Sequence, residues 1–345
     1  MTIRRFFLTT AFAMASLAVV HANADQDWAY LLSLDAGPKK KPSSKEETLL
    51  LARNHFLLHR KALEQFLQRY PSDPRAFDAK MKLAAILAAE GKMDSDPSKV
   101  DQALRILADL EADKSAPLTK RADAGFQRAS LLMQNVRPDR GRDLIVSTAQ
   151  HFAKRYPDDR RAPRLLVEAA TVCDDKPELK KELLMQALPS ASDIALKSRI
   201  SDDLRRLDLL GKPLDIEMPS LKGAPLDLEK LRGNVVLIIF WASDAPHSLL
   251  WLRDFRANLS SLPQDQFRVV TVNLDTDKSR AIEKTSILGT GWPTGFDGQG
   301  WNGSVVRSLG INALPTVWIV DKGGVLRSLN AKTDYKSWIQ RLVRE

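Results

Sequence analysis

The order of apolar and polar positions changes once along this chain, near residue 211. From residue 44 to residue 210, apolar side chains recur every three or four positions, as Leu63, Phe66 and Tyr70 do. That spacing predicts amphipathic helices, and prolines at intervals mark where they begin or end. After residue 211 the apolar positions gather into short continuous runs. The pattern therefore predicts a multidomain protein, with an all-α region over 44–210 and an α/β domain over 211–345.

Three apolar runs in the second half predict the strands of a sheet, at 234–241, 268–275 and 314–321. The first of these runs has no polar position after Asn234, which is typical of a strand that is covered on both faces. Further elements are expected around them: helices over 246–261 and 278–288, a hairpin turn at 322–324, an edge strand at 325–329 and a terminal helix that carries Tyr335 and Trp338. The expected order is β-α-β-α-β-β-α.

The helical half contains an internal repeat. The segment 66–76 (FLQRYPSDPRA) matches 152–162 (FAKRYPDDRRA), 86 positions later, and a weaker copy lies between them at 110–124. A period of about 43 residues is the length of one helix pair in an α-solenoid. The turn before each alanine-rich helix resembles tetratricopeptide-like repeats of bacterial envelope proteins. Such a stack implies a groove for a partner, although the helices could instead only support the second domain.

The N-terminus has the pattern of a secretory signal peptide over residues 1–24. Arg4 and Arg5 precede an apolar run, and the small-residue pattern Ala22-Asn23-Ala24 follows it, which predicts cleavage after Ala24. The run is short for a membrane span, although an uncleaved anchor is the alternative. We expect a periplasmic or secreted protein with no transmembrane segment after cleavage.

Residues 25–43 are predicted to be a flexible tether, because their second half is charged and rich in turn-forming residues. Ser44 and Glu47 then have the spacing of a capping box, so a helix is expected to begin there. Asp73 and Asp96 each precede a proline, and both are expected to be N-caps.

The distribution of charged residues and of histidines argues against a nucleic-acid site and against a metal site. The formal net charge of +9 falls to +7 when the leader removes Arg4 and Arg5, because no acid is lost. No stripe of basic residues with interleaved aromatics is present, so no nucleic-acid partner is expected. His55 and His59 share a helix face, but no third ligand accompanies them, and no metal site is predicted.

Cys173 is the only cysteine in the chain, so no internal disulfide can form. It lies near the end of an apolar helical run. A small buried hydrophobe is the expected role, and a reactive or intermolecular thiol is the alternative.

The segment 238–248 (IIFWASDAPHS) resembles the strand-to-helix turn of a thioredoxin. The sequences at 211–216, 231–237, 292–293 and 310–316 match the same pattern. Together they resemble the TlpA-like and ResA-like thioredoxins, which are secreted relatives of the peroxiredoxins. The resemblance implies a thioredoxin-like fold, and a thiol-disulfide oxidoreductase or peroxidase activity.

The chain departs from this family at the atoms that perform its chemistry. Ala245 and Ser248 occupy the positions of the two cysteines, so no thiolate nucleophile is available there. A triad of Asp244, His247 and Ser248 is not expected, because side chains of adjacent helical residues diverge. Pro315 matches the family's cis-proline, and the resemblance implies that the backbone of the residue before it pairs with an extended substrate chain. Five binding residues are therefore predicted: Trp241, Asp244, His247, Leu314 and Pro315.

The sequence predicts a non-catalytic protein that binds an extended peptide or an envelope protein, as an adaptor or holdase. No catalytic residue, cofactor or metal is expected. Two alternatives stay open. One is a thiol-disulfide oxidoreductase or peroxidase, as the family implies, and the other is a purely structural domain that caps the helical repeats.

Overall fold

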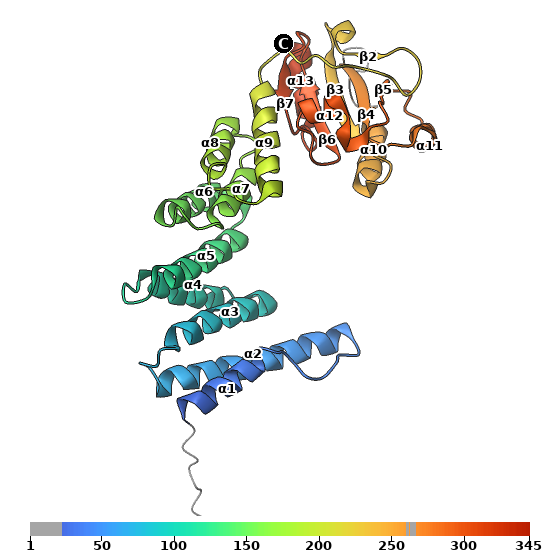
Figure 1. The fold of residues 1–345 in the computed structure, drawn as a ribbon. Helices are drawn as coiled ribbons and strands as arrows, with labels where there is room; N and C mark the ends of the chain where they lie inside the picture. The colour runs from blue at the N-terminus through green and yellow to red at the C-terminus, as the bar shows by residue number, and fades with distance from the viewer. Residues whose placement is uncertain (1–22, 260–261, 263–266) are drawn as a thin grey trace, which may run out of the picture. The chain divides into compact units, whose positions relative to one another are not determined.

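The computed structural model describes residues 23–259, 262 and 267–345 (Figure 1). Most of the predicted signal peptide therefore lies outside the described residues. The chain divides into two compact units between Leu131 and Leu132. Within the described ranges, no helix is both long and apolar enough to cross a bilayer. The fold is a helical region followed by a mixed α/β domain, as the apolar pattern predicts.

Consecutive helices fill the chain up to residue 209. Their bounds are α1 Ala24–Leu34, α2 Lys45–Arg69, α3 Ala76–Asp94, α4 Pro97–Ala112, α5 Leu118–Asn135, α6 Pro138–Arg155, α7 Ala162–Thr171, α8 Pro177–Ala187 and α9 Ile194–Leu209. The C-caps of α2, α4 and α6 are Tyr70, Asp113 and Tyr156, which are 43 positions apart. The period that the sequence predicts is therefore present in the helix boundaries.

The repeated segment has the same local structure in both of its strong copies. Asp73 accepts hydrogen bonds from the backbone and Nε of Arg75, both at 2.8 Å, and Asp159 accepts the same two bonds from Arg161 at 2.9 Å. These bonds hold the pKa of Asp73 down to about 2, and the pKa of Asp159 is lowered for the same reason. A buried phenylalanine precedes each turn, at Phe66 and Phe152.

The predicted tether is wrong over its first part, because residues 24–34 form α1. Asn23 caps this helix by accepting a hydrogen bond from Gln26 N, and Leu31 and Leu34 are buried. Leu31 packs with Leu63 and Phe66 in one apolar cluster. Burial of this apolar face against α2 stabilises the helix.

Two of the predicted caps are confirmed and one is wrong. Ser44 Oγ accepts a hydrogen bond from Glu47 N at 3.1 Å, and Asp96 accepts one from Ser98 N at 3.0 Å. Asp73 does not cap α3, which begins only at Ala76. Its carboxylate closes a turn onto Arg75 instead.

The α/β domain is built on a five-stranded sheet in the order β5-β4-β3-β6-β7. The strands are β3 Val235–Trp241, β4 Phe267–Asn273, β5 Thr294–Gly295, β6 Thr316–Val320 and β7 Leu326–Ser328. β3 is parallel to β4 and antiparallel to β6. The strands that the sequence predicts at 234–241, 268–275, 314–321 and 325–329 are thus confirmed, whereas the two-residue β5 was not predicted. β1 Glu217–Met218 pairs with β2 Leu226–Asp227 in a separate two-stranded sheet.

Helices accompany this sheet at α10 Pro246–Asn258, α11 Lys278–Leu288, α12 Ser304–Ser308 and α13 Tyr335–Arg344. All seven residues of β3 are buried. Alternate residues of the strand belong to two separate apolar clusters, one that includes Ile238 and Trp318 and one that includes Ile239 and Phe255 of α10. A core on each face of the sheet explains why this run contains no polar position.

Candidate binding site at the 242–248 turn and the Leu314–Pro315 loop

The end of β3 and the start of α10 form a short turn. β3 ends at Trp241, Ala245 is the N-cap of α10, and Pro246 is its first residue. Ser248 N donates a hydrogen bond to the Ala245 carbonyl at 2.8 Å. The two positions that the sequence comparison assigns to cysteines are therefore joined within the first turn of a helix. In a cysteine, this position would lower the thiol pKa through the helix dipole.

The side chains at these two positions cannot exchange disulfides. Ala245 presents a methyl group and is half-buried. Ser248 is fully buried, and its hydroxyl has no hydrogen-bond partner among the described residues. A buried hydroxyl without a partner destabilises a protein by roughly 1–3 kcal/mol.

The buried carboxylate of Asp275 holds the turn in place through hydrogen bonds, and the sequence did not predict this role. Asp275 accepts hydrogen bonds from Ser243 N at 2.8 Å, Ser243 Oγ at 2.5 Å and Asn273 Nδ2 at 3.1 Å. All three residues are buried. The sequence contained one signal for this contact, because the polar residues Asn273 and Asp275 end the apolar run that forms β4. The sheet register then places Asn273 opposite Trp241, at the end of β3.

The five predicted binding residues fall into three groups. Asp244 and His247 are exposed on the turn. Leu314 is half-buried, Pro315 is buried, and the peptide bond between them is cis, as the sequence predicts. The prediction for Trp241 is wrong, since this side chain is 1 % exposed in the core and cannot contact a ligand at the surface. Its position inside the β3 run already favours the core.

Residues 211–329 match the AhpC/TSA family. The C-terminal domain is an AhpC/TSA-family domain. No curated protein matches the chain.

Several solved structures are similar to this chain. The C-terminal domain of a thiol-disulfide oxidoreductase from Bacteroides thetaiotaomicron is 20% identical, with 39% of this chain and 96% of that chain covered and a TM-score of 0.37. A thiol:disulfide interchange protein DsbE from Chlorobium tepidum is 24% identical over 39% of this chain and 98% of its own, with a TM-score of 0.33. An uncharacterized thioredoxin-like protein from Bacteroides vulgatus is 26% identical, with 38% of this chain and 86% of that chain covered and a TM-score of 0.32.

The single thiol of the chain lies outside the AhpC/TSA-family domain. Cys173 is fully buried just after α7, and its Sγ donates a hydrogen bond to the Ala169 carbonyl at 3.4 Å. Burial raises the pKa of this thiol above its usual value. The structure therefore favours the buried-hydrophobe interpretation of Cys173.

In the described part of the chain, no three metal-ligating side chains come together, whether around His55 and His59 or elsewhere. The rings of His55 and His59 lie 6.0 Å apart between centroids. His59 is buried 3.8 Å from a carboxylate oxygen of Asp35, and burial lowers its pKa.

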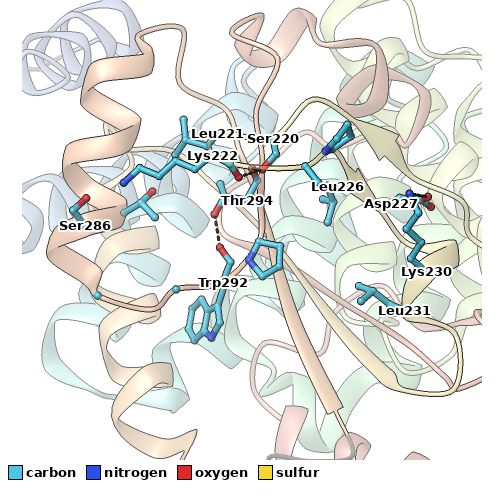
Figure 2. A pocket seen from close by; sticks show the side chains of 16 residues that line it. Ser220, Leu221, Lys222, Leu226, Asp227, Lys230, Leu231, Ser286, Trp292 and Thr294 are labelled. Carbon is cyan, nitrogen blue, oxygen red and sulfur yellow. Dashed lines mark hydrogen bonds and ion pairs between the residues drawn. The ribbon is translucent and has the colours of Figure 1, made fainter.

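Two cavities are lined by residues of the AhpC/TSA-family domain. One, of about 500 Å³, is lined by Pro315 and its loop together with residues of α7, α9, β7 and α13, and we refer to it as the Pro315 cavity. Figure 2 shows the other, of about 550 Å³, in which Lys230 and Asp227 lie on one side and Ser286 on the other. No residue of the 242–248 turn lines this second cavity.

Proposed function

We propose that this protein is an exported, non-catalytic thioredoxin-like protein that binds extended polypeptide segments. The observation that carries the proposal is the absence of a thiol at Ala245 and Ser248, in a turn that has a helix N-terminus and the neighbouring Asp275 anchor.

The chemistry of the chain supports a non-catalytic role. Disulfide exchange and thiol peroxidase chemistry both begin with a thiolate. Cys173 is buried and its raised pKa keeps it protonated near neutral pH. It also lies in the helical region, so it cannot replace a cysteine pair at the turn.

The surface around the turn supports peptide binding. Asp244 and His247 are exposed beside the start of α10. The Leu314–Pro315 segment, which precedes β6, offers backbone groups for the addition of an extended chain. An adaptor or holdase in the cell envelope would use such a surface, in agreement with the signal peptide that the sequence predicts over residues 1–24.

The catalytic part of the proposal is tested with an insulin-disulfide reduction assay in dithiothreitol. The mature wild-type protein is compared with Cys173→Ser and with the double variant Ala245→Cys plus Ser248→Cys. We expect no activity from the first two proteins and a measurable rate from the double variant, because the turn retains the geometry that activates a thiol. Activity of the wild type that Cys173→Ser abolishes would overturn the proposal and favour an oxidoreductase.

The binding part is tested with reduced, carboxyamidomethylated lactalbumin as the probe. We expect the mature protein to bind it, and the double variant Asp244→Ala plus His247→Ala to bind about fivefold more weakly. Arg253→Ala, an exposed change on the outer part of α10, is the control and should have no effect. Absence of binding by the wild type would contradict the proposed function.

A further inference from the structure

The Pro315 cavity continues into a neighbouring cavity of about 480 Å³, which lies along α7 and α9. The two cavities share Val167, Thr171 and Arg199 as lining residues. The cavities therefore adjoin at these residues, and together they extend from the side of these two helices to the cis-proline loop. We refer to the two cavities together as the α7–α9 groove.

Hydrogen bonds hold α9, which forms one wall of this groove, against the segment before the cis-proline. Asn312 donates from Nδ2 to Asp203 at 3.1 Å and accepts from Arg206 Nη1 at 2.6 Å. Arg205 of α9 donates to the Arg307 carbonyl at 2.5 Å. A groove that is held open in this way loses little entropy when a ligand orders it.

The Pro315 cavity carries one positive charge that its own residues do not neutralise. Its other charged side chains are paired within the protein: Asp174 with Lys180 at 2.5 Å, Asp175 with Arg142 at 2.8 Å, Asp203 with Arg206, and Arg327 with Asp321 at 2.9 Å. Arg199 is exposed, and its guanidinium has no ion pair within residues 23–259 and 267–345. It is thus free to bind the carboxylate of a ligand.

The uncharged lining of the Pro315 cavity combines apolar side chains with polar ones. Val167 and Pro315 are buried in its wall, and Leu207 and Trp338 are partly exposed to it. Glu168 lines only the neighbouring cavity, where Arg164 pairs with Asp193 at 3.3 Å. Within the Pro315 cavity, Arg199 therefore offers a positive charge beside these apolar side chains.

We propose that the α7–α9 groove binds an extended polypeptide segment that carries an apolar side chain next to a carboxylate. The apolar side chain occupies the Pro315 cavity, and the carboxylate pairs with Arg199. This inference rests on the proposed function and specifies which segments the protein selects.

Synthetic peptides test the inference through a change of charge at one position. The probe is a fluorescein-labelled heptapeptide amide, Gly-Gly-Val-Leu-Glu-Gly-Gly, and its counterparts carry Gln or Lys in place of Glu. Polarisation titrations with the full mature chain should show the Glu peptide binding about tenfold more tightly than the Gln peptide. Arg199→Gln should abolish this preference, and Arg199→Glu should transfer it to the Lys peptide.

Lys197→Gln is the matched control, because Lys197 is exposed on the same helix and lines neither cavity. It should keep the wild-type preference. Since Arg199 makes no ion pair in the described part of the chain, all three variants should melt at the wild-type temperature, which circular dichroism would verify.

The outcomes separate the two proposals. Equal binding of the three peptides, together with retained binding of unfolded lactalbumin, would overturn the role of Arg199 and leave the proposed function intact. Loss of both peptide and lactalbumin binding in the wild type would overturn both proposals.

Discussion

The carboxylate of Asp275, just past the end of β4, accepts two hydrogen bonds from Ser243, one from its backbone N–H at 2.8 Å and one from its hydroxyl at 2.5 Å. This contact joins the turn between β3 and α10 to the neighbouring strand. Both residues are buried, so the two bonds are shielded from water. The position of the turn, and of everything that could bind there, depends on this pair.

Replacement of Asp275 by alanine should destabilise the protein by roughly 2–4 kcal/mol, because it leaves the Ser243 N–H and the Asn273 amide buried without their acceptor. Urea unfolding measures the change. Asp244→Ala, an exposed acid of the same turn, is the control and should change stability by less than about 0.5 kcal/mol. Equal effects of the two changes would contradict the structural role of Asp275.

Cys173 should be unreactive in the folded protein, because it is fully buried and burial raises its pKa. With Ellman's reagent at neutral pH, we expect the thiol to react at least about 100-fold more slowly than in urea-unfolded protein. Raising the pH should speed the reaction less in the folded than in the unfolded protein, since the raised pKa delays formation of the thiolate. Rapid titration of the native thiol would instead identify Cys173 as a reactive residue.

Gly91 marks a close approach between α3 and the start of α4. A Cβ at this position would lie 2.8 Å from Val100 Cγ2 and 2.9 Å from the Asp96 carbonyl oxygen. Gly91→Ala should therefore destabilise the protein by about 1–3 kcal/mol, although alanine is the better helix former. Ala85→Gly, an exposed change on the same helix, should cost about 1 kcal/mol through propensity alone. A stabilised Gly91→Ala protein would show that the two helices can move apart.

The helices around His59 should lose stability in acid. Asp35 of the α1 end, His55 of α2 and Lys82 of α3 surround this buried ring, and desolvation lowers its pKa below the usual 6.5. The unfolded chain therefore takes up the proton first as the pH falls below 6.5, so stability is complete above that pH and decreases below it.

Hydrogen exchange measures this effect directly. After correction for the intrinsic rate, protection of the α1 and α2 amides should fall between about pH 7 and pH 5. His59→Gln should remove the pH dependence, whereas His151→Gln, an exposed change on α6, should retain it. An identical pH dependence in the His59 variant would contradict the assignment.

Much of the fold follows from the sequence because local signals and tertiary packing agree. The apolar run of β3 is buried at every position, and the bounds of α11 coincide with the predicted 278–288. Ser44 and Asp96 cap their helices through bonds to residues two or three positions away, which a sequence pattern can encode. The repeat likewise reappears as two matching Asp–Arg turns.

The sequence by itself determined the two kinds of domain, the 43-residue helical period and the absence of a thiol at Ala245 and Ser248. Only the tertiary structure decided that residues 24–34 fold as a helix, that Trp241 belongs to the core, and that Asp275 anchors the turn. It also brought Arg199 and Pro315 into the lining of one cavity. The reason is physical: periodicity and capping arise from neighbours along the chain, whereas burial and cavities depend on contacts between residues that are far apart in it.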